Sequence, residues 1–315
     1  MPPPPLPPFS SYPATNTENL MIYGRAKKDP FKWLSKPNFD QNENFFSEDR
    51  RADLTESYKD LNKMEEFFST ILTDALLEKI AKYTNIRINL RKIQAKPITL
   101  NEIKAYVGLL ILFGLTDKSK ISIHYIWSKS SCHYAPFAAA ALSRERFQLI
   151  SHNITFEDKT ESILIKNKKS NPKFHQMEEI WKIFKTNITL IFIASNFLCI
   201  DETLYAARVR CAFRQYMKNK PAKYGLKYWC LVDACYRYLL AVDIYLGKNS
   251  PDEKKETQVG MKAVLNLMEP YFKTNRSLTV DNFFTSMILA EKLWSEKITL
   301  VGTVNVKKIL YQSSF

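Results

Sequence analysis

The chain has 315 residues, of which 45% are hydrophobic and 25% are charged, a balance typical of folded proteins. It carries 46 lysines and arginines against 32 acids, a formal net charge of +14. This excess favours a polyanionic partner, nucleic acid first and an anionic membrane surface second. The longest apolar run, residues 105–115, is too short to cross a bilayer and is predicted to be a buried helix. We therefore expect a folded, intracellular protein that does not insert in a membrane.

Residues 1–49 differ from the rest in composition. Nine of the fifteen prolines lie within residues 1–37, and such a segment buries too little apolar surface to fold by itself. We predict a flexible arm, with a polyproline ligand for an aromatic groove as the alternative. The five cysteines include no CxxC pair, so we expect them to be reduced and structural.

Residues 50–190 have the apolar spacing of helices. Helix starts are predicted at Thr73, at the Thr99–Glu102 capping box and near Ser143. A fourth helix is marked by apolar residues at three- and four-residue spacing between Phe174 and Ile188. The polar stretch 159–172 is predicted to be an exposed loop. This region is therefore expected to be an all-helical domain.

Beyond Ser195 the apolar pattern becomes strand-like. The order of candidate elements is β-β-β-α-β-α-β, which predicts a mixed sheet flanked by helices in residues 191–315. The whole chain is thus expected to be α+β, helical first and then a sheet. The candidate strands are residues 197–200, 228–232, 238–245, 277–280 and 299–304, with a hairpin at 233–237 and helices at 260–272 and 285–296.

Asp201 and Asp281 each follow an apolar strand candidate, eighty positions apart. If the two strands are neighbours in the sheet, both carboxylates project from one edge, and a divalent cation relieves their repulsion. Mg²⁺ in such a site serves phosphoryl transfer. The alternative is that acids occur at strand ends because the chain there meets water. The four histidines precede the sheet and are not expected to be ligands.

Residues 208–227, the basic segment, contain seven cations and no acid. This density predicts a track that contacts the phosphates of double-stranded DNA. Phe213, Tyr216 and Tyr224 lie among the cations and are candidates for stacking on unpaired bases. A solvated loop whose aromatic side chains pack inward is the alternative. The cations are Arg208, Arg210, Arg214, Lys218, Lys220, Lys223 and Lys227.

Five motifs in this half of the chain resemble those of the piggyBac transposase family. Ile200-Asp-Glu-Thr-Leu204 is similar to the family's IDE-x-[LM], and Thr279-Val-Asp-Asn-Phe-Phe-Thr-Ser286 to T-x-D-N-[FW]-[FY]-[TS]-S. The other three are the segment from Arg208 to Tyr216, Asn219-Lys-Pro-Ala-Lys-Tyr-Gly-Leu-Lys227, and Leu300-Val-Gly-Thr-Val304.

The resemblance implies an RNase H-like catalytic core preceded by a helical dimerisation and DNA-binding domain. Family members cut and join DNA with three metal-binding aspartates, and Asp201 and Asp281 match two of them. The third is expected well beyond Asp281, so the resemblance implies a core truncated within residues 191–315, which holds Mg²⁺ weakly. We therefore expect a nuclear DNA-binding protein, a possible homodimer without a small-molecule substrate, whose incomplete site does not excise or insert DNA.

Two other hypotheses remain. The chain is either a catalytically silent chromatin or protein-interaction module, or a metal nuclease that uses only two carboxylates. Steep salt dependence of binding separates phosphate contacts from protein contacts, and a nicking assay tests the nuclease.

Overall fold

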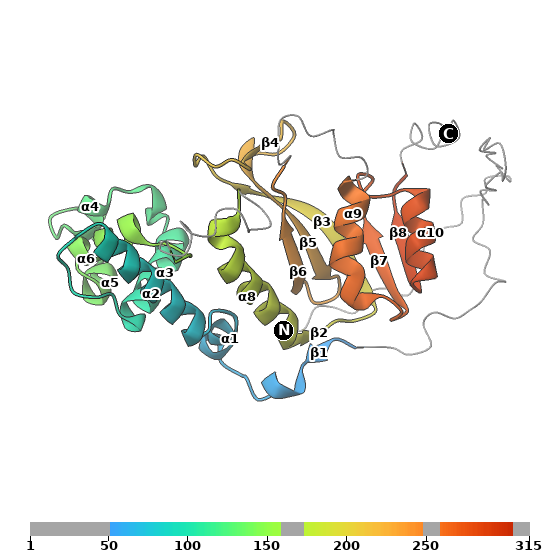
Figure 1. Ribbon diagram of the computed structural model, residues 1–315, viewed down its shortest axis with the longest axis horizontal. Coiled ribbons are helices and arrows are strands. Elements are labelled where there is room, and N and C mark those ends of the chain that lie inside the picture. The colour runs from blue at the N-terminus through green and yellow to red at the C-terminus, as the bar shows by residue number, and fades with distance from the viewer. Residues whose placement is uncertain (1–50, 159–172, 248–258, 305–315) are drawn as a thin grey trace.

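The computed structural model describes residues 51–158, 173–247 and 259–304. Two hydrophobic cores organise them, one among the helices of the N-terminal half and one around the sheet. Figure 1 shows the helical part on the left, the sheet with two covering helices on the right, and one long helix between them. The arm expected in residues 1–49 and the loop expected at 159–172 lie outside the described residues.

The helical part confirms the four predicted helices and their starts. The hydroxyls of Thr73, Thr99 and Ser143 each accept a hydrogen bond from the backbone N–H three residues on. Three further helices in the described part of this half are short, and α4 and α5, with five and six residues, are too short for a period to show. The helices are α1 (Met64–Ile71), α2 (Asp74–Leu90), α3 (Leu100–Leu115), α4 (Ile123–Trp127), α5 (Pro136–Ala141), α6 (Arg144–Asn153) and α8 (His175–Ile191).

The prediction that residues 105–115 are buried is wrong for one side of α3. Tyr106, Leu109 and Phe113 are buried against neighbouring helices, whereas residues 110–112 are 40–48% exposed and Leu115 is 77% exposed. A continuous apolar run contains no period that says which side will be covered. Within the described residues, no helix combines the length and apolarity needed to cross a bilayer.

Glu102 connects three segments of the helical part. It accepts a hydrogen bond from the backbone N–H of Thr99 at 2.9 Å, which closes the capping box. Its carboxylate also pairs with Arg146 of α6, whose guanidinium donates to the carbonyls of Lys96 and Pro97 at 2.8 Å. The hydrogen bond from Arg146 is the main cause that lowers the pKa of Glu102 to about 2, against the opposing effect of partial burial.

This pKa predicts an acid-sensitive contribution to stability. Because the folded-state value is below the ordinary 4.5, the contribution is fully present above about pH 5 and is lost as the pH falls towards 2. Its upper limit is about 3 kcal/mol. As the pH falls from 5 to 3, the free energy of unfolding measured with urea should therefore decrease more steeply in the wild type than in Glu102→Gln. Glu78→Gln, at an exposed position of α2, should keep the wild-type slope, and equal slopes in all three proteins would contradict the assignment.

The second half confirms the predicted mixed sheet. Its strands lie in the order β4-β5-β3-β7-β8, and β6 pairs with β5. β3 pairs antiparallel with β5 and parallel with β7, and β8 is parallel to β7. The strands are β3 (Phe197–Ala206), β4 (Gln215–Tyr216), β5 (Tyr224–Asp233), β6 (Leu239–Ile244), β7 (Arg276–Val280) and β8 (Ile298–Gly302). β1 (Asp53–Leu54) and β2 (Phe192–Ile193) form a separate pair.

Two helices cover one face of this sheet, α9 (Val259–Met268) and α10 (Met287–Ser295). Ile200 and Val280 belong to the same buried cluster as Val264 of α9 and Leu289 of α10. Because side chains alternate along a strand, Asp201 points to the opposite face from Ile200. In Figure 1, α9 and α10 lie in front of the strands and α8 runs beside them towards the helical part.

Asp233 has the hairpin role that its position predicted. Its side chain is fully buried, and its Oδ1 accepts hydrogen bonds from the N–H groups of Cys235 at 3.0 Å and Tyr236 at 2.9 Å. Its Oδ2 accepts from Ser195 N–H at 2.7 Å, just before β3. Asp243 of β6 instead pairs with Lys185 of α8 at 2.8 Å. Both carboxylates are therefore engaged in structure, away from Asp201.

Candidate metal and nucleic-acid site

Asp201 and Asp281 come side by side because their strands are parallel neighbours. The β3–β7 ladder runs from Phe197 opposite Ser277 to Ile200 opposite Val280, and each aspartate directly follows this last pair. Adjacent strands lie about 4.8 Å apart, so the two carboxylates start from neighbouring backbone positions. Both residues are exposed. The condition on which the sequence hypothesis depended, that the two strands are neighbours, is confirmed.

The expectation that β3 ends at Asp201 is wrong. β3 continues to Ala206, held by an antiparallel ladder with β5 that extends from Leu198 opposite Asp233 to Ala206 opposite Gly225. β7 ends at Val280, so the part of β3 after Asp201 has no parallel neighbour on that side, whereas β5 continues beside it. Asp201 therefore lies where its parallel neighbour ends, in the middle of its own strand.

A hydrogen-bonded turn fixes Asp281. Its backbone carbonyl accepts from Phe284 N–H at 3.0 Å, Thr285 N–H at 3.1 Å and Thr285 Oγ1 at 2.9 Å. The next residue, Ser286, caps α10 with its hydroxyl. The run from Val280 to Ser286 is thus a strand end, a turn and a helix start in succession. This arrangement holds the backbone of Asp281 without using its side chain, whose Oδ1 accepts only the adjacent N–H of Asn282 among the described residues.

Gly302 leaves the space that this turn requires. It pairs with Val280 across β7 and β8, and a Cβ atom there would overlap Thr285 Oγ1 and lie 3.0 Å from the Val280 carbonyl oxygen. Gly302→Ala should therefore displace Thr285 and lower the free energy of unfolding by about 1–3 kcal/mol. Urea denaturation measures the loss. Gly114→Ala is the control, because α3 leaves open space there and alanine favours a helix; an equal loss in both variants would contradict this packing.

Two thiols flank Asp201 on its face of the sheet. Cys230 lies opposite it on β5, and Cys199 lies two residues before it. Burial first, and the charge of Asp201 in addition, raise the pKa of both thiols, although a hydrogen bond with Thr203 lowers that of Cys230. The thiols therefore stay protonated at neutral pH, so the carboxylate oxygens are the hard donors at this position.

The two carboxylates fit a hydrated divalent cation. Oxygen ligands suit Mg²⁺ or Mn²⁺, and Mg²⁺ usually keeps several waters beside one or two carboxylates. Neither Asp201 nor Asp281 has an ion-pair partner among the residues that the structure describes. In those same ranges no group of three or more His, Cys, Asp or Glu side chains is placed to hold a metal. The candidate ligands that the register brings together are therefore these two carboxylates.

The basic segment follows β3 and folds into β4 and the start of β5, at the top of the sheet in Figure 1. Five of its seven cations are exposed and two are half-buried. Lys220 forms an ion pair with Glu202 at 3.6 Å, which brings the turn before β5 back to the strand position next to Asp201. The exposed cations are Arg208, Arg210, Arg214, Lys218 and Lys223.

Two residues of the segment have mainly internal contacts. Lys227 lies 2.6 Å from Glu202, with its side chain only 12% exposed. The guanidinium of Arg214 donates to the carbonyl oxygens of Arg208 at 3.4 Å and Val209 at 3.2 Å, and its Cζ lies 5.3 Å from the ring centre of Tyr224. The spacing of the cations in the segment could not predict these contacts, because Lys227 pairs with an acid outside the segment and Arg214 donates to backbone carbonyls.

The aromatic residues of the segment divide between the two predicted roles. Phe213 is buried against Phe174, with 5.8 Å between ring centres. Tyr216 and Tyr224 are 56% and 47% exposed, with their ring centres 4.9 Å apart. Phe213 therefore packs inward, while the tyrosine pair presents ring surface to solvent.

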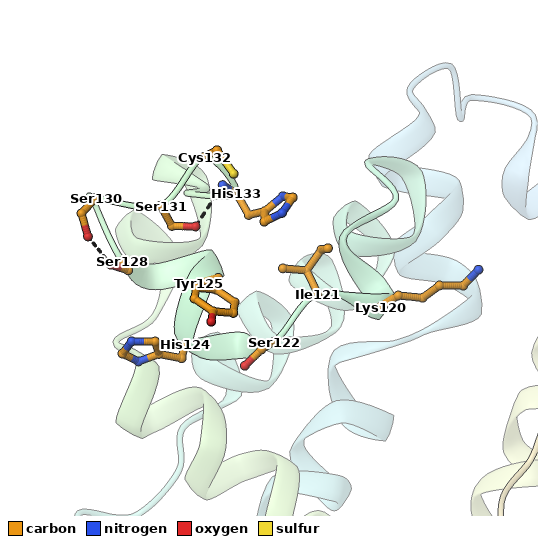
Figure 2. A pocket seen from close by; sticks show the side chains of 10 residues that line it. All are labelled: Lys120, Ile121, Ser122, His124, Tyr125, Ser128, Ser130, Ser131, Cys132 and His133. Atoms are coloured by element: carbon orange, nitrogen blue, oxygen red, sulfur yellow. Dashed lines mark hydrogen bonds between the residues drawn. The ribbon is translucent and has the colours of Figure 1, made fainter.

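A pocket of about 670 Å³ lies at the far end of the helical part, around α4. Figure 2 shows serine and histidine side chains around it, with hydrogen bonds joining Ser128 to Ser130 and Ser131 to the backbone of His133. The ring nitrogen Nδ1 of His124 lies 3.0 Å from a guanidinium nitrogen of Arg144. α4 lies far from β3 in Figure 1, and among the described residues these histidines belong to no group of three or more potential metal ligands.

Comparison with known proteins finds relatives that are transposases or proteins derived from them. The family model described as "Transposase IS4" matches residues 64–312. The chain is 26% identical over 243 residues to human piggyBac transposable element-derived protein 3, covering 76% of this chain and 39% of that protein. The human chimeric ERCC6-PGBD3 protein matches at the same identity and coverage of this chain, over 22% of its own length.

A solved structure agrees with these relatives. The cryo-EM structure of a piggyBac transposase synaptic complex with hairpin DNA superposes with a TM-score of 0.72 and 28% identity, covering 82% of this chain and 54% of that one. The helical part followed by an RNase H-like mixed sheet is thus the shared architecture. The chain spans little more than half the length of that structure and less of the two human relatives. On its sequence and its fold, the chain belongs to the piggyBac transposase family.

Proposed function

We propose that this chain binds DNA through its basic segment, beside a divalent-cation site formed by Asp201 and Asp281. The observation that carries the proposal is the parallel register that makes the two aspartates neighbours. The ion pair from Lys220 to Glu202 supports it, because this contact ties the basic turn to β3 at the residue after Asp201, on the other face of the sheet from that carboxylate. Family membership, and the DNA in the related synaptic complex, favour DNA over other polyanions.

The exposed cations supply the contacts that such a partner needs. Arg208 and Arg210 can bind a phosphate through two N–H groups, and Lys218 and Lys223 act as point charges. The exposed rings of Tyr216 and Tyr224 offer stacking surfaces to unpaired bases. The segment therefore combines phosphate contacts with base stacking, which is the combination that suits a distorted or partly opened duplex.

The carboxylate pair supports a proposal about chemistry as well. When bound, a divalent cation would activate a water or hydroxyl and stabilise the leaving oxygen of a phosphodiester. Asp201 and Asp281 would hold it, while the basic segment places the phosphate. Because the described residues offer two carboxylates, we propose that the chain binds DNA and a single hydrated ion and does not by itself complete excision or insertion of DNA.

A salt titration of the full chain tests the DNA proposal. Fluorescence anisotropy with a labelled duplex, at NaCl from about 50 to 300 mM, should give a linear fall of log affinity with log salt. The expected slope is about −0.9 for each phosphate contact, so about −4 for four or five contacts. Binding that is absent, or that does not change with salt, would favour the protein-interaction module instead.

A further inference from the structure

Lys227 is enclosed on the face of the sheet opposite to the one that Asp201 faces. Its ammonium lies 2.6 Å from a carboxylate oxygen of Glu202. It also lies over three aromatic rings, at 4.9 Å from the ring centre of Phe283, 5.7 Å from that of Tyr245 and 5.9 Å from that of Trp229. All three distances are within the range of cation–π attraction. With 12% of its side chain exposed, Lys227 has little surface left for a phosphate.

The partners of Lys227 are the near neighbours of the two aspartates. Glu202 directly follows Asp201 on β3, and Phe283 lies two residues after Asp281 in the turn that fixes its backbone. One cation therefore contacts both carboxylate-bearing segments from behind. β3 and β7 have no ladder contact beyond Ile200 and Val280, so this is a contact that joins the two segments after the ladder ends.

The turn itself is supported from a second side. Gly260, at the start of α9, is buried, and a Cβ atom there would lie 3.2 Å from the ring of Phe283. The Phe283 ring thus has two contacts, one with the α9 backbone and one with the Lys227 ammonium. Movement of Lys227 would remove one of these contacts and loosen the turn that begins at Asp281.

We infer that Lys227 is a positioning residue, which fixes the placement of Asp281 relative to Asp201 by holding Phe283 and Glu202 together. Its link to cation binding rests on the proposed function. The inference removes Lys227 from the set of expected DNA contacts and assigns it to the carboxylate pair. The positive charge of Lys227 is required because the ammonium makes an ion pair with Glu202 and cation–π contacts with three rings. An apolar side chain would leave Glu202 without this partner.

The test uses the full chain and three substitutions. Lys227→Met removes the charge and keeps most of the side-chain volume, Lys227→Arg keeps the charge, and Phe283→Leu removes the ring that the ammonium contacts. Lys292→Met makes the same charge change at an exposed position of α10 and is the control. Phe283 is 45% exposed, so Phe283→Leu should fold even if Lys227→Met does not.

Amide hydrogen exchange is the first readout, because it does not require a metal. The N–H groups of Phe284 and Thr285 donate to the Asp281 carbonyl, so they report whether the turn is closed. Their exchange should be about tenfold faster in Lys227→Met and Phe283→Leu and unchanged in Lys227→Arg and Lys292→Met. Unchanged exchange in the first two variants would overturn the inference, whatever their metal binding.

Mn²⁺ affinity and the DNA salt slope complete the test. Mn²⁺, titrated by electron paramagnetic resonance, should bind about tenfold more weakly to Lys227→Met and Phe283→Leu, with Lys227→Arg close to the wild type. A wild type that binds no Mn²⁺ would refute the proposed cation site, and the exchange data would still decide the role of Lys227. A salt slope reduced by about 0.9 in Lys227→Met, with normal exchange, would show a phosphate contact and overturn the inference.

Discussion

Replacing Arg208, Arg210, Lys218 and Lys223 with glutamine should flatten the salt dependence of DNA binding by up to about 3.6 in slope, at about 0.9 for each lost contact. These four cations are exposed, and none forms an ion pair within the described ranges. At about 0.5–1 kcal/mol for each exposed contact, affinity near physiological salt should fall on the order of a hundredfold. Anisotropy titrations at several NaCl concentrations measure both quantities.

A control variant separates the segment from the overall charge of the protein. Lys82, Lys96, Lys292 and Lys297 are exposed residues outside the segment, and changing all four to glutamine lowers the net charge by the same four units. This control should keep most of the wild-type slope. An equal loss of slope in both quadruple variants would mean that long-range attraction to the net charge, and not the basic segment, governs binding.

Much of the fold was predictable because its local signals are strong. Side-chain caps at Thr73, Thr99 and Ser143 satisfy backbone N–H groups that would otherwise lack partners, so the residue type alone marks each helix start. The hairpin at Asp233 was predictable from length, since residues 233–237 form a connection of hairpin length between two β-rich runs. In contrast, β4 has two residues and depends on pairing with β5, which leaves no local signal.

The site was predictable only in part, because its remaining features depend on contacts between distant residues. Two acids after apolar strand candidates predicted the carboxylate pair, and the parallel β3–β7 ladder confirmed that the two strands are neighbours. The length of β3 depended on β5 and could not be read from β3 itself. The enclosure of Lys227 required Glu202, Tyr245 and Phe283 to meet, although they come from three strands or their ends.

Changing either aspartate to asparagine should abolish most of the Mn²⁺ binding of the chain. At an effective dielectric constant of 20, one unit charge about 4 Å from another contributes about 4 kcal/mol, and the attraction is larger for a divalent ion at ligand distance. Asp201→Asn or Asp281→Asn should therefore weaken Mn²⁺ binding at least on the order of a hundredfold. Because a single ion needs both carboxylates, the double variant should bind little worse than either single one.

For the same substitutions we expect no loss of stability in the absence of metal, which would exclude misfolding as the cause of weaker Mn²⁺ binding. Without metal, two carboxylates on neighbouring strands repel each other, so removing one charge relieves strain in the folded state. Each single variant should therefore melt at the same temperature as the wild type or a higher one when EDTA is present, and should lose the stabilisation that Mn²⁺ gives the wild type. Differential scanning calorimetry with and without Mn²⁺ measures both effects.

If a variant melts lower in EDTA, its carboxylate has a structural partner and the pair is not a cation site. If both variants keep wild-type Mn²⁺ affinity, the ion binds elsewhere, and the neighbouring ends of the β3–β7 ladder do not form a metal site.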